Sequence, residues 1–171
     1  MTKSTKFVMA VAGVALAGIA GTGVAQASTT AHPAGSGAPS SCRPANLKTK
    51  ITPDTASSGH RHYRVTLTAA PKTSACQLAG SPRNVKFYDN GSLKGITTKP
   101  YGSQNTKVTF GPGHPVHFDI QVSNTAKGAP ANRTVFTLRT PGGGVIPGNQ
   151  EADGKLSVDF GTQIGPVKPG A

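Results

Sequence analysis

Four histidines lie in two short clusters, His60-Arg-His62 and His114-Pro-Val-His117. Neutral imidazole nitrogens bind zinc or copper when several of them converge. On an extended chain His60 and His62 share one face of a strand, whereas His114 falls in a turn and His117 in a strand. Their convergence would need a particular pairing of strands. We therefore expect four independent surface histidines and no bound metal, with a metal site on these residues as the alternative.

Only six acidic residues could supply a catalytic carboxylate pair. Glycoside hydrolysis needs two such groups flanking the bond that breaks. Glu151 and Asp153 fall in a Gly-rich loop, and Asp119 and Asp159 are predicted on outward faces of strands. Asp119 and Asp159 are therefore expected to be solvated surface charges. The acidic residues predict no catalytic carboxylate pair.

Other catalytic motifs are missing from the chain. No G-x-S-x-G pattern presents a serine nucleophile. Gly111-Pro-Gly113 and Gly142-Gly-Gly144 are not followed by a helical pattern whose amides could hold a phosphate, and both predict turns. We expect no enzyme and no cofactor. An extracellular hydrolase or a metal-binding protein is the alternative.

The strongest compositional feature is the charge, which is +12 over 171 residues. Such an excess attracts polyanions over long range. The basic residues are spread from Arg43 to Lys168, with no run of five and no interleaved aromatic residues that could stack on bases. We therefore expect no sequence-specific nucleic acid. Outside a cell the abundant polyanions are wall polymers and acidic polysaccharides. An anionic cell-wall polymer or an envelope protein is the expected partner, and a merely well-charged secreted domain is the alternative.

The first 27 residues have the pattern of a secretory signal peptide. Lys3 and Lys6 begin it, Phe7 to Ala20 are almost all apolar, and Val24-Ala-Gln-Ala27 resembles a cleavage site. The apolar run is shorter than the ~20 residues that a membrane span needs. We expect cleavage after Ala27, a secreted, extracellular protein and no membrane anchor after cleavage. Cleavage removes two lysines and no acid, so the charge becomes +10.

The remaining chain divides into three parts. Residues 28–41 contain small, polar and proline residues and are expected to form a disordered linker. Residues 42–161 are predicted to be the folded domain, and residues 162–171 a flexible C-terminal tail.

Apolar residues of the domain alternate with polar ones, which is typical of half-buried strands. The clearest case is Val116 to Val122, where every second residue is apolar. Asp89-Asn-Gly-Ser92 predicts a tight hairpin. The pattern favours an all-β, antiparallel two-sheet sandwich that is immunoglobulin-like, with a closed barrel as the alternative. Five phenylalanines are the expected large core residues: Phe87, Phe110, Phe118, Phe136 and Phe160.

The chain has two cysteines, Cys42 and Cys76. Disulfides are common in small exported domains, and the chain has no C-x-x-C redox motif. We expect the two to form one disulfide.

Two segments resemble a known family. Cys76-Gln-Leu-Ala-Gly-Ser-Pro82, with a first cysteine upstream, is similar to the Cys-x-Leu-x-Gly-x-Pro signature of domain-of-unknown-function family 4232, found in secreted actinobacterial proteins. The segment from Val108 to Phe118 is similar to that family's strand, Pro-Gly turn and strand. The resemblance implies an extracytoplasmic β-sandwich with no assigned activity. Gly80 and Pro82 would form the turn after the disulfide, and Gly111 and Gly113 the reversal between strands.

We expect a secreted, non-enzymatic β-sandwich domain whose role is binding or structural support at the cell envelope or in the extracellular space, through a basic surface. A protein inhibitor that presents the Gly- and Pro-rich loop from Pro141 to Gly154 is a further alternative.

Overall fold

The computed structural model describes residues 37–124 and 127–171. In these residues the only helical element is the 3-10 turn η1 (Pro44–Asn46), and no helix is long and apolar enough to span a membrane. The predicted signal peptide, residues 1–27, lies outside the described residues. So does most of the predicted linker. The described end of that linker is ordered against the domain, since Ser41 N–H donates to the Ser74 carbonyl at 2.9 Å.

The described residues form strands in this chain order: β1 (Leu47–Ser57), β2 (His60–Ala69), β3 (Cys76–Ala79), β4 (Arg83–Asp89), β5 (Ser92–Leu93), β6 (Lys99–Pro100), β7 (Lys107–Phe110), β8 (Val116–Ser123), β9 (Ala129–Thr137), β10 (Gln150–Val158), β11 (Gln163–Ile164) and β12 (Lys168–Pro169).

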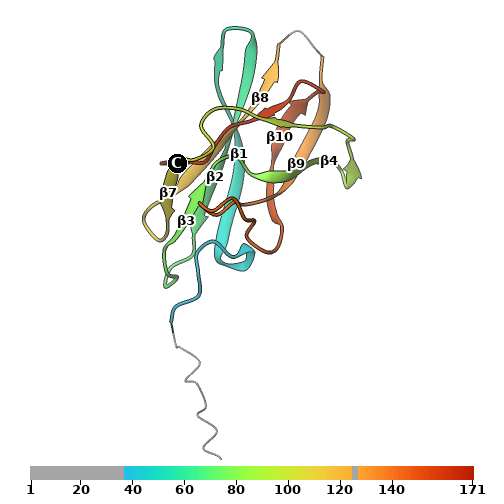
Figure 1. Ribbon diagram of the computed structural model, residues 1–171. Coiled ribbons are helices and arrows are strands. Elements are labelled where there is room, and N and C mark those ends of the chain that lie inside the picture. The colour runs from blue at the N-terminus through green and yellow to red at the C-terminus, as the bar shows by residue number, and fades with distance from the viewer. Residues whose placement is uncertain (1–36, 125–126) are drawn as a thin grey trace, which may run out of the picture. The chain divides into compact units, whose positions relative to one another are not determined.

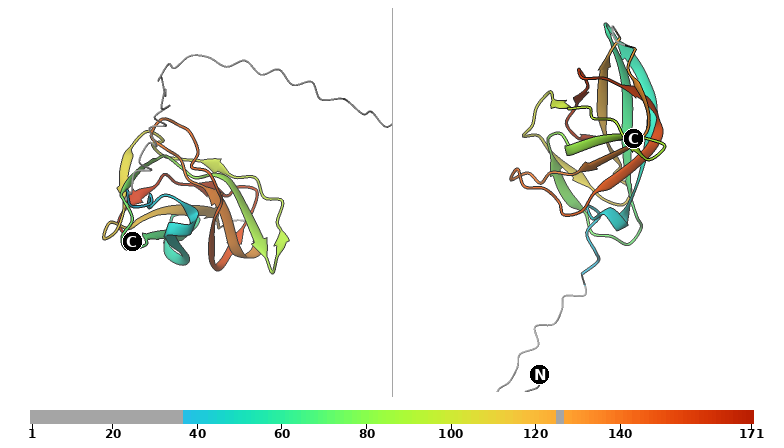
Figure 2. Two further views of the ribbon diagram at one scale, coloured as in Figure 1. Left: turned by 90° about the horizontal axis from the view of Figure 1, so that it is seen from below. Right: turned by 90° about the vertical axis from the view of Figure 1, so that its right-hand side faces the viewer.

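Two larger sheets make up most of the domain (Figure 1). The first has the order β1-β2-β8-β11-β6, and β12 also pairs with β8. The second has the order β10-β9-β4-β5, and the β4–β5 hairpin extends from its edge (Figure 2). A separate two-stranded sheet joins β3 to β7. The pairings between these strands are antiparallel except for β6 with β11. The all-β, sandwich-like prediction is confirmed.

The core lies between the two larger sheets. Val65 and Leu67 of β2, Phe118 of β8 and Phe136 of β9 are fully buried. The Phe118 and Phe136 rings meet across the sheets, edge to face, with centroids 4.9 Å apart. Such a contact contributes about 0.5–1.5 kcal/mol beyond the burial of its area. Alternation of apolar residues along each strand thus produces one shared interior.

Phe160 is the exception among the five expected core phenylalanines, because 82% of it is exposed. Strand β10 ends at Val158, and the next residues form a turn in which Thr162 N–H donates to the Asp159 carbonyl at 3.0 Å. The alternating pattern of β10 therefore stops one apolar residue earlier than its spacing predicts. The prediction that Phe160 is in the core is wrong.

Residues 162–171 do not form the expected flexible tail. Ile164 pairs with Ile120 and Lys168 pairs with His117, so this segment supplies two short strands that pair with β8. Ile164 and Val167 are almost fully buried. The sequence does not predict these strands, because each is only two residues long and too short to show an alternating pattern. The glycine and proline residues around them are typical of a flexible segment.

The predicted disulfide is confirmed. It joins Cys42 to Cys76, with 6.1 Å between the Cα atoms, and links the start of the domain to β3. The predicted hairpin at Asn90-Gly91 is also present, and both residues have positive φ angles, 48° and 84°. Positive φ at both central positions is typical of the tight turn that matches strand twist.

Candidate functional site

The histidines that could have bound a metal are held apart in the structure. In the β2–β8 register His62 lies opposite Gln121, and His117 lies opposite Thr66. Four residues of strand, about 13 Å, therefore separate the two histidines. His117 is not the surface histidine that was expected, because it is only 9% exposed. Its Nδ1–H donates to the Gly170 carbonyl at 3.0 Å.

The other two histidines are also placed separately. His60 contacts the Ser58 carbonyl through Nδ1, and His114 is exposed in the β7–β8 turn. Among the described residues no group of three or more His, Cys, Asp or Glu side chains could hold a metal ion.

The carboxylates of the first sheet have partners within the protein. Asp119 Oδ2 accepts from Lys168 Nζ at 2.9 Å, and the Asp119 residue is only 9% exposed. The expectation of a solvated charge at Asp119 is wrong, because β8 is buried on both faces from Val116 to Ile120. Asp54 accepts from the backbone N–H of Thr55 and from Arg64, and these contacts lower the pKa of Asp54.

Asp159 lies in the turn after β10 and not on the outward face of a strand as expected, and its Oδ2 is buried with no hydrogen-bond donor among the described residues. Its Oδ1 accepts from the Gly161 N–H at 2.8 Å. Asp119 and Asp159 thus have different partners, and neither contact links the two into a carboxylate pair.

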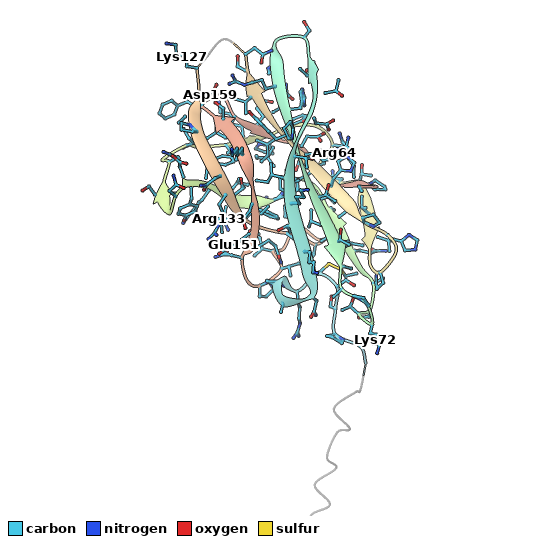
Figure 3. The ribbon with its side chains drawn as sticks, turned by 180° about the vertical axis from the view of Figure 1, so that it is seen from behind. Arg64, Lys72, Lys127, Arg133, Glu151 and Asp159 are labelled. Atoms are coloured by element: carbon cyan, nitrogen blue, oxygen red, sulfur yellow. A yellow bond between two sulfur atoms is a disulfide. The ribbon has the colours of Figure 1, made fainter. Side chains whose placement is uncertain are left out.

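Glu151 and Asp153 lie on the outward face of β10 and not in a loop as expected. Arg133 of β9 bridges them, with Nη1 3.2 Å from Glu151 and Nε 2.9 Å from Asp153, and the labelled pair Arg133 and Glu151 is visible in Figure 3. The hydrogen bond to Asp153 is the largest cause of the raised pKa of Arg133. An open hollow of about 740 Å³ lies over these residues and Tyr88.

Most of the cations lack an acidic partner. Arg64, Lys94, Arg133 and Lys168 form ion pairs within the described residues. Eleven other Lys and Arg residues form none there. All but Arg139 are exposed: Arg43, Lys48, Lys50, Lys72, Arg83, Lys86, Lys99, Lys107, Lys127, Arg139 and Lys155. We call these residues the unpaired cations. They occur on both larger sheets, and Lys72 and Lys127 lie at opposite ends of the domain (Figure 3).

A polar cluster surrounds the turn after the disulfide. Gln104 Oε1 accepts from the Ser81 N–H at 2.8 Å and from Arg139 Nη1 at 3.2 Å. Gln104 Nε2 donates to Ser81 Oγ at 2.9 Å and to the Tyr101 carbonyl at 2.9 Å. Ser81 Oγ in turn donates to the Ile164 carbonyl at 2.8 Å. The cluster joins three segments that are far apart in sequence.

Gly80 makes this cluster possible. Its φ is +69°, and a Cβ atom there would lie 2.6 Å from Arg139 Nη1 and 2.7 Å from the Gln104 carbonyl oxygen. Any other residue would displace the guanidinium and the backbone of Gln104. Pro82 is buried beside it. The predicted turn thus has a second role, which is to admit Arg139 and Gln104.

The reversal predicted at Gly111 and Gly113 is present between β7 and β8. His114 N–H donates to the Gly111 carbonyl at 2.9 Å. A Cβ atom on Gly111 would lie 2.9 Å from the Ala75 Cβ, so glycine allows the close approach of the chain beside Cys76.

A family model described as Domain of unknown function (DUF4232) matches residues 42–168. The chain belongs to the DUF4232 family. No curated protein and no solved structure matches it. The DUF4232 match extends through β11 to Lys168, which agrees with the packing of these residues against β8.

Sequence reasoning identified Gly80 of the DUF4232 domain but missed Gln104 and Arg139. Both lie far from Gly80 in sequence, and neither belongs to a motif. The pairing of Ala79 N–H with the Arg139 carbonyl, at 3.1 Å, and that of Arg83 with Thr137 bring the end of β9 to the turn.

Proposed function

We propose that this protein is a secreted, non-enzymatic binding module that attaches to an anionic polymer of the cell envelope through its basic surface. The observation that carries the proposal is the unequal pairing of charges. All six carboxylates accept hydrogen bonds or form ion pairs within the domain. The unpaired cations other than Arg139 are left facing solvent.

The distribution of these cations favours a long polymer over a compact ligand. They occur on both sheets and at both ends of the domain, so a chain of repeated anionic groups can contact several of them at once. Each contact between exposed charges contributes little in water, and the sum over many contacts supplies the binding. Such binding weakens as salt rises, because exposed charges are screened beyond about 8–10 Å at physiological ionic strength.

Retention on an isolated envelope fraction tests the proposal. We expect the purified protein to be retained at about 50 mM salt and released at about 1 M, where the screening length falls to about 3 Å. No retention at low salt, or retention that persists at high salt, would contradict the electrostatic proposal.

Matched variants locate the effect. Lys48→Gln/Lys50→Gln on β1 and Lys99→Gln/Lys107→Gln on β6 and β7 each remove two charges. We expect both pairs to weaken retention by a similar amount. The exposed Thr68→Gln/Thr109→Gln pair is the uncharged control and should be retained like the parent.

A further inference from the structure

A small pocket lies beside the Gly80–Pro82 turn. Its volume is about 260 Å³. This is below the roughly 300–1,000 Å³ of sites that enclose drug-sized ligands. None of the described residues that line it is acidic, and two are arginines: Ser81, Pro82, Arg83, Asn84, Thr98, Pro100, Gln104, Arg139 and Ile164. We call it the Arg83–Arg139 pocket.

Arg139 has unused hydrogen-bonding capacity. A guanidinium has five N–H donors, and here Nη1 donates to Gln104 Oε1 at 3.2 Å. Its Nε is buried and has no acceptor within the described residues. Neither Arg139 nor Arg83 forms an ion pair with a described carboxylate. A buried donor without an acceptor is unfavourable, so the protein does not fully satisfy the hydrogen-bonding capacity of this guanidinium.

Gln104 holds Arg139 in place. Its side-chain oxygen accepts from two groups, and its nitrogen donates to Ser81 Oγ and to the Tyr101 and Gly102 carbonyls. With both ends engaged, Gln104 orients the guanidinium and is not itself free for a ligand. Asn84, also at the pocket, is anchored through its Nδ2 to Thr137 Oγ1 at 3.3 Å. Arg139 and Asn84 are therefore held in position before any ligand arrives.

We infer that the Arg83–Arg139 pocket binds one oxyanion group, a phosphate or a carboxylate. Both groups present oxygens that a guanidinium fork can bind in pairs. The size of the pocket admits a single such group and not a whole sugar chain. Only the source of the anion, a repeating unit of the envelope polymer, rests on the proposed function.

Amide NMR titrations of the purified protein test this site, with inorganic phosphate in one arm and acetate in the other. We expect at least one arm to give saturable shifts centred on Ser81, Asn84, Gln104 and Arg139. The arm that saturates at lower concentration identifies the preferred oxyanion. Absence of saturable shifts at these residues in both arms would overturn the inference.

Substitutions separate the pocket from general charge. Arg139→Gln should weaken binding of the saturating anion about 10- to 100-fold, as expected for the loss of charge-assisted hydrogen bonds. Lys72→Gln removes the same charge from an exposed residue that does not line the pocket, and should leave the affinity unchanged. Equal losses in both variants would overturn the inference.

Arg83→Gln guards against a folding defect in Arg139→Gln, because Arg83 is exposed. Arg83→Gln should also weaken binding of the saturating anion. An unchanged affinity in this well-folded variant would exclude the two-arginine site. A glycerol-phosphate polymer and polygalacturonate, tested for retention, separate the two proposals. Pocket shifts without polymer retention support the pocket and contradict the proposed function. Polymer retention without pocket shifts supports the proposed function and contradicts the pocket.

Discussion

Two ion pairs of equal length lie on the two sheets in different surroundings. Lys168 is 2.9 Å from Asp119 beside β8, and Arg133 is 2.9 Å from Asp153 on β9 and β10. The two cations are equally exposed, at 48% of the side chain. The carboxylates differ, because Asp119 is 12% exposed and Asp153 is 72% exposed.

The difference comes from the neighbours of each strand. β8 is buried on both faces from Val116 to Ile120, and Lys168 and Tyr101 lie close to Asp119 on its second face. β9 and β10 present their outward face to solvent beneath the open hollow. The two ion pairs have equal distances but should contribute unequally to stability, because water screens the exposed pair more than the enclosed one.

The largest expected effect concerns the enclosure itself. Ile164→Ala should lower the free energy of unfolding by about 2–5 kcal/mol, because it removes a fully buried side chain that packs beside β8. Val145→Ala, at a residue 47% exposed, should change it by less than about 0.5 kcal/mol. Denaturant titration compares them. Equal small effects would show that the C-terminal strands do not enclose β8.

The two carboxylates give the next contrast. Asp119→Asn should cost about 1–3 kcal/mol, since a hydrogen bond to an enclosed charged group is lost. Asp153→Asn should cost about 0–1 kcal/mol. Repeating the denaturant titrations at about 1 M salt sharpens the contrast, because screening should abolish the Asp153 effect and spare that of Asp119. The account of burial fails if both variants cost the same at low salt.

The smallest expected effect appears only in alkali. Burial, and secondarily the charge of Asp119, raises the pKa of Tyr101 to about 12. The unfolded chain releases this proton near pH 10, so the contribution of Tyr101 to stability is present below about pH 10 and is lost between pH 10 and about 12. In Tyr101→Phe the highest step of the tyrosinate absorbance titration should disappear. If that step persists, Tyr101 is not the shielded phenol.

How far the sequence could predict this structure depends on the range of each signal. Local patterns sufficed for the β8 alternation, the Asn90-Gly91 hairpin and the Gly111–Gly113 reversal. The disulfide followed from composition and expected compartment. The predictions for Phe160 and for the C-terminal segment were wrong. The chain turns just before Phe160, and strands of two residues are too short to show a period.

The candidate site was less predictable for the same reason. Gly80 was visible as a turn residue, but Gln104 and Arg139 reach it only through tertiary pairing. Asp119 illustrates the limit most clearly, since alternation predicts which face of β8 it is on and cannot tell that this face is buried as well.

The most direct test of the proposed function is the affinity for a glycerol-phosphate polymer over a salt series. For binding by several exposed cations, the logarithm of the affinity should fall linearly with the logarithm of the salt concentration, and the slope should be shallower in Lys48→Gln/Lys50→Gln. An affinity that does not change with salt, or a slope that is the same in the variant and the parent, would contradict the account.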